Sequence, residues 1–71
     1  MRGKAYAIVC CNRIVDISLS RNNAQEILMD YAFEDGAWWY GYYVKTYGHS
    51  IALKEANEAI DEWRIWEYDL V

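Results

Sequence analysis

Asp35 is the residue whose sequence surroundings come closest to those of a catalytic acid. It lies close to Trp38 and Trp39, and apolar surroundings raise the pKa of a carboxyl group toward the range that general acid catalysis needs. No second catalytic group accompanies it, because the single histidine, His49, falls in a different predicted turn. The sequence also has no phosphate-cradling loop or dinucleotide fingerprint. We therefore predict a protein that is not an enzyme and has no cofactor, with Asp35 in a turn or a helix kink.

The two cysteines, Cys10 and Cys11, are the only other residues that suggest site chemistry. They are adjacent in a segment with the pattern of a β-strand, where successive side chains point to opposite faces. A buried cysteine usually behaves as a small apolar side chain. One histidine and two diverging thiols also fall short of the three or four convergent ligands of a zinc site. We predict no disulfide, no redox pair and no metal site, and a reducing compartment.

Aromatic residues are unusually abundant for so short a chain. Its 71 residues include seven Tyr, four Trp and one Phe. A domain of this size buries only about 60% of the surface that its unfolded chain exposes. Tyr and Trp anchor interfaces because they combine a large apolar area with a polar group and few rotatable bonds. The surplus predicts a protein partner, which is either a different protein or a second copy of the chain.

Two segments near the N-terminus alternate in the way that half-buried strands do: residues 4–11 and 14–19. The dipeptide Asn12-Arg13 should join them in a hairpin. In that register Cys11 pairs with Ile14, and the other residues of the two strands pair in order from there. The predicted inner face of the hairpin then consists of Tyr6, Ile8, Cys10, Val15, Ile17 and Leu19.

The apolar spacing changes to the helical period after a cap within residues 21–23, and no proline interrupts it. We predict one helix over about residues 23–47, leaving open whether it is continuous or broken at Asp35-Gly36. Gly48 should end it. A second helix is predicted over residues 51–63, with three alanines that allow close helix approach: Ala52, Ala56 and Ala59.

Alternation with a period of two returns near the C-terminus and predicts a third strand over residues 64–71. Trp66, Tyr68 and Leu70 would share one of its faces. This strand could pair with either strand of the hairpin. The predicted fold is a single α+β domain with the order ββααβ, in which a small three-stranded sheet has two helices packed on one face.

The first helix is apolar on two sides. One side should cover the sheet, which predicts that Trp38, Trp39 and Tyr42 pack against three sheet residues: Ile8, Ile17 and Trp66. The other side carries what we call the second apolar stripe: Met29, Phe33, Tyr40, Val44 and Tyr47. A helix that is apolar all round in so small a domain is expected to be engaged by a partner. We therefore predict that the second apolar stripe binds the partner.

Charge excludes one class of partner and permits another. The chain has 11 acidic and 7 basic residues, and its net charge is −4. A protein that tracks a phosphate backbone needs a basic face, so we predict no direct binding of nucleic acid. Four acidic residues of the second predicted helix, here called the acidic face, could imitate phosphates in the basic groove of another protein, or could simply be solvated: Glu55, Glu58, Asp61 and Glu62.

The N-terminal segment superficially imitates a secretory signal, with Arg2 and Lys4 before an apolar run. The run has the minimum length for such a signal, Arg13 follows it closely, and no small-residue cleavage site intervenes. The aromatic run over residues 37–44 is far shorter than the roughly 20 residues of a membrane span. We predict a soluble cytoplasmic protein that does not bind membranes.

The sequence of elements resembles that of small acidic proteins from bacteriophages and mobile elements. The likeness spans the whole chain: hairpin 6–19, aromatic helix 24–47, acidic helix 51–63 and strand 65–71. Some proteins of this kind inhibit host defence, and anti-CRISPR proteins are among them. The resemblance rests on size, acidity and element order, so no functional residue can be carried over. It implies a phage-derived inhibitor of a host nucleic-acid-processing or CRISPR effector protein, acting in the bacterial cytoplasm.

Overall fold

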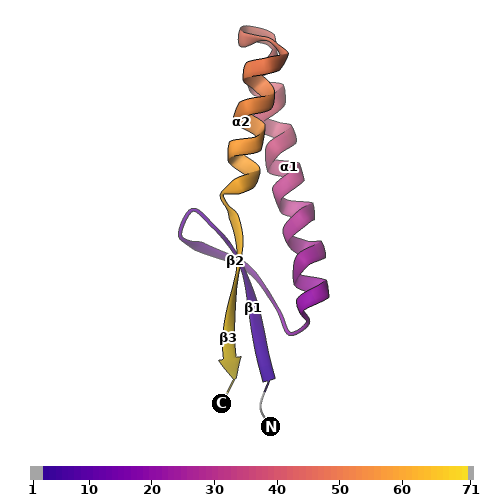
Figure 1. Ribbon diagram of the computed structural model, residues 1–71, viewed down its shortest axis with the longest axis vertical. Helices are drawn as coiled ribbons and strands as arrows, with labels where there is room; N and C mark the ends of the chain where they lie inside the picture. Colours follow the sequence, from indigo (N-terminus) through magenta and orange to yellow (C-terminus); the bar gives the residue numbers. More distant parts are fainter. Residues whose placement is uncertain (1–2, 71) are drawn as a thin grey trace.

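The structure is a computed structural model that describes residues 3–70 (Figure 1). Arg2 of the basic N-terminal stretch and Val71 of the predicted third strand lie outside the described residues. The α+β class and the order ββααβ are confirmed. The elements are β1 (Gly3–Cys10), β2 (Arg13–Ser18), α1 (Arg21–Tyr47), α2 (His49–Asp61) and β3 (Trp63–Leu70).

The three strands form one antiparallel sheet in the order β2-β1-β3. Strand β3 therefore pairs with β1, which settles the alternative that the sequence left open. Because β1 is central, it supplies the most buried part of the sheet, where Ala7, Ile8 and Val9 are at most 4% exposed. Among the described residues, Ile8 is the one large side chain that is completely buried.

The hairpin register differs from the predicted one. Cys10 pairs with Arg13, so the two-residue loop is Cys11-Asn12. Both loop residues have positive φ, 56° and 63°, as a type I′ turn requires, and this turn matches the right-handed twist of the strands. Opposite the junction of Ile8 and Val9 the register shifts by one residue, so Val15 is the extra residue of a β-bulge.

This register reverses the predicted face of β2. Tyr6 pairs with Ser18, and Ser18 Oγ accepts a hydrogen bond from Asn23 Nδ2 of α1 at 3.0 Å. Side chains that pair directly share a face of the sheet, so Tyr6, Ile8 and Cys10 face α1 as predicted. Ile17 instead points to the opposite face and is 58% exposed. The bulge accounts for this reversal, because the shifted loop changes the pairing by two residues and would by itself keep Ile17 on the predicted face.

Strand β3 is oriented by its first residue. Trp63 pairs with Cys10 and its ring stacks on Tyr31 of α1, with a centroid distance of 5.4 Å and an interplanar angle of 7°. Trp63 Nε1 also donates a hydrogen bond to Asp35 Oδ2 at 3.1 Å. Trp63 therefore lies on the helix side, and alternation sends Trp66 to the other side. The prediction that Trp66 faces the helices is wrong.

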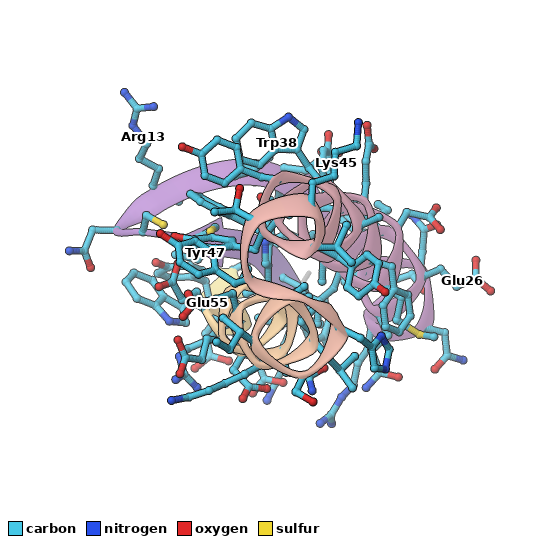
Figure 2. The ribbon with its side chains drawn as sticks, turned by 90° about the horizontal axis from the view of Figure 1, so that it is seen from above. Arg13, Glu26, Trp38, Lys45, Tyr47 and Glu55 are labelled. Carbon is cyan, nitrogen blue, oxygen red and sulfur yellow. The ribbon has the colours of Figure 1, made fainter. Side chains whose placement is uncertain are left out.

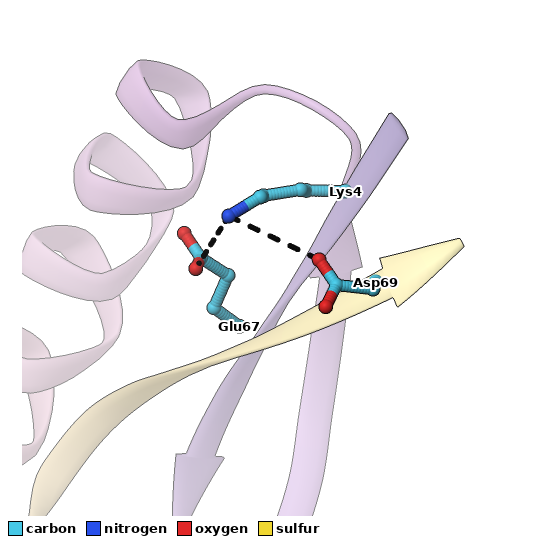
Figure 3. A network of polar contacts seen from close by, with 3 residues as sticks. All are labelled: Lys4, Glu67 and Asp69. Carbon is cyan, nitrogen blue, oxygen red and sulfur yellow. Dashed lines mark hydrogen bonds and ion pairs between the residues drawn. The ribbon is translucent and has the colours of Figure 1, made fainter. Parts of the chain in front are cut away.

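Polar contacts also link the outer end of β1 to β3 (Figure 3). Lys4 Nζ lies 3.0 Å from Glu67 Oε2 and 3.9 Å from Asp69 Oδ1. The hydrogen bond to Glu67 and the two carboxylate charges raise the pKa of Lys4. These groups are solvent-exposed, so the network contributes little to the stability of the fold. We infer that its role is to favour the pairing of β3 with β1.

Helix α1 begins one residue after Ser20, whose Oγ accepts a hydrogen bond from the Asn23 backbone N–H at 3.3 Å. The helix is continuous through Asp35 and Gly36 and ends at Tyr47, followed by the capping residue Gly48, whose N–H donates to Val44 O. Gly48 has φ of 86°, a value that favours glycine. Helix α2 then starts at His49, two residues earlier than predicted, without a side-chain cap.

Gly36 lets the two helices approach each other. An added Cβ at this position would lie 2.8 Å from Ile60 Cδ1 and 3.3 Å from the Ala56 carbonyl oxygen. The seam between the helices is otherwise made of buried alanines: Ala32, Ala52, Ala56 and Ala59. Gly36, which we considered as a possible break in the first helix, is thus a contact point in a continuous helix.

The helical hairpin is longer than the sheet it covers. Helix α1 has 27 residues and spans about 40 Å, whereas β1 has 8 residues and spans about 26 Å. The molecule therefore measures 53 × 19 × 14 Å. Figure 1 shows that the N-terminal half of α1 passes along the sheet. The C-terminal half of α1 extends beyond the end of the sheet, and α2 packs against that half.

The close helix contact gives a stability prediction with an internal control. Gly36→Ala should destabilise the protein by about 1–3 kcal/mol, because the added methyl group overpacks the seam. Gly41→Ala should instead stabilise it by about 0.5–1 kcal/mol, because nothing lies within 4 Å of a Cβ at that position. Urea unfolding followed by circular dichroism measures both changes. Equal stabilisation by the two substitutions would contradict the close approach at Gly36.

Candidate functional site

Five aromatic rings on the distal half of α1 contact one another in a continuous series, which we call the aromatic ladder: Trp38, Trp39, Tyr42, Tyr43 and Tyr47. Trp38 stacks on Tyr42 with centroids 5.5 Å apart, and Trp39 stacks on Tyr43 at 5.8 Å. Tyr43 contacts Tyr47 at 5.6 Å. Each pair is four residues apart, the spacing at which side chains meet on a helix surface. The helix therefore holds the rings in a fixed array.

The ladder does not pack on the sheet, contrary to the prediction for Trp38, Trp39 and Tyr42. Trp38 is 60% exposed and Tyr42 is 62% exposed. Both lie on the sheet-facing side of α1, as the helical period indicates, but they come after Asp35, which already contacts the first residue of β3. The helix side was predicted correctly for Trp38 and Tyr42, whereas Trp39 lines a groove with residues of α2. The sheet ends before it reaches Trp38 and Tyr42.

The second apolar stripe lies partly in solvent. Met29, Phe33 and Tyr47 are 52–57% exposed. Tyr40 and Val44 are half-buried near the turn between the helices, and Tyr40 Oη is hydrogen-bonded to His49 Nδ1 at 2.8 Å. The stripe is thus an exposed surface at its two ends and part of the interhelical contact between them. Its role in binding a partner stays a prediction.

The face of the sheet away from the helices carries a second group of exposed apolar side chains, which we call the open sheet face. Its members are 43–58% exposed, and the strand register places them together: Ile14, Ile17, Trp66, Tyr68 and Leu70. No element within residues 3–70 covers this face. The sequence indicated an apolar face on β3 but assigned it to the core.

The predicted acidic face divides between two sides of α2. Glu55, Glu58 and Glu62 line a groove with two ladder rings, while Asp61 lines a different hollow beside Phe33. Figure 2 shows Glu55 on the same side of the hairpin as Tyr47. Three of the four acidic residues therefore adjoin the aromatic ladder.

The groove between the ladder and α2 has a volume of about 220 Å³. Its walls are the rings of Trp39 and Tyr43, both half-buried, and Ala59 lies among its lining residues. Burial raises the pKa of Tyr43, and the nearby charges of Glu55 and Glu58 raise it further. No pattern in the sequence indicated this groove, because its two sides come from helices that pair only in the fold.

The two thiols lie much closer together than predicted. Cys10 Sγ and Cys11 Sγ are 3.2 Å apart, because Cys11 belongs to the turn, with positive φ, rather than to the strand. Cys11 Sγ also donates a hydrogen bond to Glu62 Oε2 at 3.4 Å. The two thiol sulfurs and a carboxylate oxygen of Glu62 lie within 4.8 Å of one another. The prediction that the two thiols point to opposite faces is therefore wrong. Burial, followed by the hydrogen bond to Cys11, raises the pKa of Cys10 to about 12, which opposes the thiolate that a metal would need.

The two residues weighed for catalysis each have a structural partner. Asp35 accepts the hydrogen bond of Trp63, and His49 is bonded to Tyr40 at the far end of α1. Their positions near opposite ends of the interhelical contact keep them from acting on one substrate. The pattern of surfaces is therefore more informative about function than the titratable groups.

Comparisons with known proteins add no identification: no protein-family model matches the chain, and neither the curated proteins nor the solved structures include a significant match. Within residues 3–70, neither helix combines the length and the apolar composition that a membrane span requires.

The turn geometry predicts unequal thiol reactivity. At pH 8, iodoacetamide should modify exposed Cys11 at least about 10-fold faster than Cys10, because the thiolate is the reactive form and the raised pKa keeps Cys10 protonated. Peptide mass spectrometry after timed alkylation measures both rates. In Cys11→Ser, Cys10 should stay slow, since burial is the main cause of its raised pKa. Equal rates in the native protein would contradict this arrangement.

Proposed function

We propose that the protein is a non-enzymatic interaction module that binds a larger protein through the aromatic ladder. The observation that carries this proposal is the stacked pair Trp38 and Tyr42, 60% and 62% exposed beyond the end of the sheet. Rings in this position contribute little to the core of the domain. Interface energy, in contrast, concentrates in a few aromatic anchors.

The ladder also has the rigidity that favours binding. Its side chains stand on a continuous helix and restrict one another by stacking, so few rotatable bonds remain to be immobilised in a complex. A helix with a row of aromatic anchors is suited to a groove on a partner, as in other helix-in-groove interactions.

The acidic residues of α2 support a more specific form of this proposal. Glu55, Glu58 and Glu62 lie beside the ladder, and the chain as a whole has a net charge of −4. A partner with a basic groove would complement this surface. We propose such a partner to be a host nucleic-acid-processing protein, such as a CRISPR effector, inhibited in the bacterial cytoplasm by a phage-derived protein.

The alternative function is a structural or regulatory homodimer that covers its aromatic surface with a second copy. The open sheet face favours this alternative, because five large apolar residues at 43–58% exposure adjoin one another on it. Exposed contiguous apolar patches of this kind mark interaction sites in soluble proteins.

Substitutions in the ladder test the proposal. Trp38→Ala and Tyr42→Ala should each weaken binding to the partner by about 2 kcal/mol or more, roughly 30-fold in Kd. The thermal unfolding midpoint should change little, because both side chains are mostly exposed. Leu53→Ala is the matched control, since Leu53 is an exposed apolar residue of α2 outside the ladder.

The partner is obtained by affinity capture from a bacterial lysate, purified, and titrated with each variant by calorimetry. Unchanged affinity of both ladder variants would reject the ladder as the interface. Sedimentation velocity of the isolated protein at micromolar concentration tests the homodimer alternative. A stable dimer that Trp38→Ala or Trp66→Ala dissociates would identify a second copy as the partner, through the ladder or through the open sheet face.

A further inference from the structure

The groove beside the aromatic ladder combines two features that together define a ligand class. One wall presents the stacked rings of Trp39 and Tyr43, 5.8 Å apart with an interplanar angle of 27°. The other side presents the carboxylates of Glu55, Glu58 and Glu62. The groove lies on the flank of the hairpin where Figure 2 places Tyr47 and Glu55.

None of these three carboxylates forms an ion pair within residues 3–70. The ion pairs found within residues 3–70 involve Lys4, Glu67 and Asp69, at the far end of the sheet. Glu62 accepts one weak hydrogen bond from Cys11. Three like charges around one groove are unfavourable for the isolated protein, and a cation that entered it would relieve their repulsion.

The rings add a preference that carboxylates alone would not give. An aromatic face attracts a cation through its quadrupole, and this attraction is strongest when the cation is partly removed from water. Both rings are half-buried, and the raised pKa of Tyr43 reflects the same burial and negative surroundings. A groove lined by aromatic rings and carboxylates suits an organic cation better than a metal ion, which would need several converging oxygen ligands.

We propose that this groove receives an arginine side chain that the binding partner presents. This inference rests on the proposed function, because it assigns the chemistry of the partner at the edge of the ladder. The guanidinium plane stacks against Trp39 and Tyr43, and its N–H groups donate to Glu58 and its neighbours. Arginine fits better than lysine, because a planar guanidinium both stacks on rings and pairs with carboxylates at two points.

The neighbouring surface indicates what surrounds this arginine in the partner. The exposed rings of Trp38 and Tyr42 adjoin the groove, through contacts of Trp39 with both. A partner segment that seats an arginine in the groove would therefore place apolar side chains on the rest of the ladder. Basic protein surfaces that normally hold phosphates supply such arginines, whereas a nucleic acid itself would be repelled by the carboxylates.

Direct titration with small probes tests the inference without the partner. We would titrate ¹⁵N-labelled protein with N-acetyl-arginine amide and follow the indole N–H signals by NMR. The Trp39 signal should shift in a saturable way, while the signal of Trp66 on the open sheet face should not. N-acetyl-citrulline amide has the same shape without the charge, and it should produce no saturable shift.

Two matched substitutions complete the experiment. The double variant Glu55→Gln, Glu58→Gln should weaken arginine binding by about 5- to 10-fold. The control Glu26→Gln removes one charge from the opposite side of the hairpin (Figure 2) and should leave binding unchanged. Circular dichroism confirms that each variant is folded.

The outcomes separate this inference from the proposed function. No saturable shift of Trp39 with the arginine probe, or equal shifts with N-acetyl-lysine amide or the citrulline probe, would overturn the arginine assignment. In that case the ladder could still bind its partner, as the Trp38 and Tyr42 substitutions report independently. A Trp39 shift that the double variant weakens and the Glu26 control retains would support the groove as an arginine site.

Discussion

The close contact between α1 and α2 is the constraint on which the rest of the structure depends. Six of the eight buried hydrophobic residues described are alanines, and a glycine meets Ile60 in the interhelical seam. Small residues let the backbones approach, and where they line the seam they leave no room for rings between the helices. The large side chains are displaced to the flanks as a result. An aromatic surface on so small a domain is therefore a consequence of how its core is packed.

Much of the fold could be predicted from the sequence because periodicity identifies elements well. The order ββααβ, the positions of both helices and the stop at Gly48 follow from local patterns. The errors arose where two elements had to be placed relative to each other. The loop at Cys11-Asn12 moved by one residue without changing which face is buried, but the bulge at Val15 turned Ile17 to the other face. Alternation alone does not show which face meets a helix.

The candidate site was less predictable, because it depends on how far the sheet extends along α1. The helical period correctly put Trp38 and Tyr42 on the side of α1 that faces the sheet. Whether the sheet extends far enough to cover them depends on where β3 meets the helix, and Trp63 sets that point through Tyr31 and Asp35. Asp35, considered first as an acid or a kink, is thus the residue that fixes how much of α1 remains uncovered.

The division of α1 into a covered and an uncovered half bears on the proposed binding of a partner. The half over the sheet is fixed by the cap at Ser20, the Ser18 contact and Trp63, whereas the distal half is held by α2 alone. Its stiffness therefore comes from the seam at Gly36, which transmits the rigidity of the base to the ladder and the groove. Because the rings, the carboxylates and the seam occupy the same two helices, the surface is already ordered before a partner arrives, and little conformational entropy remains to be lost on binding.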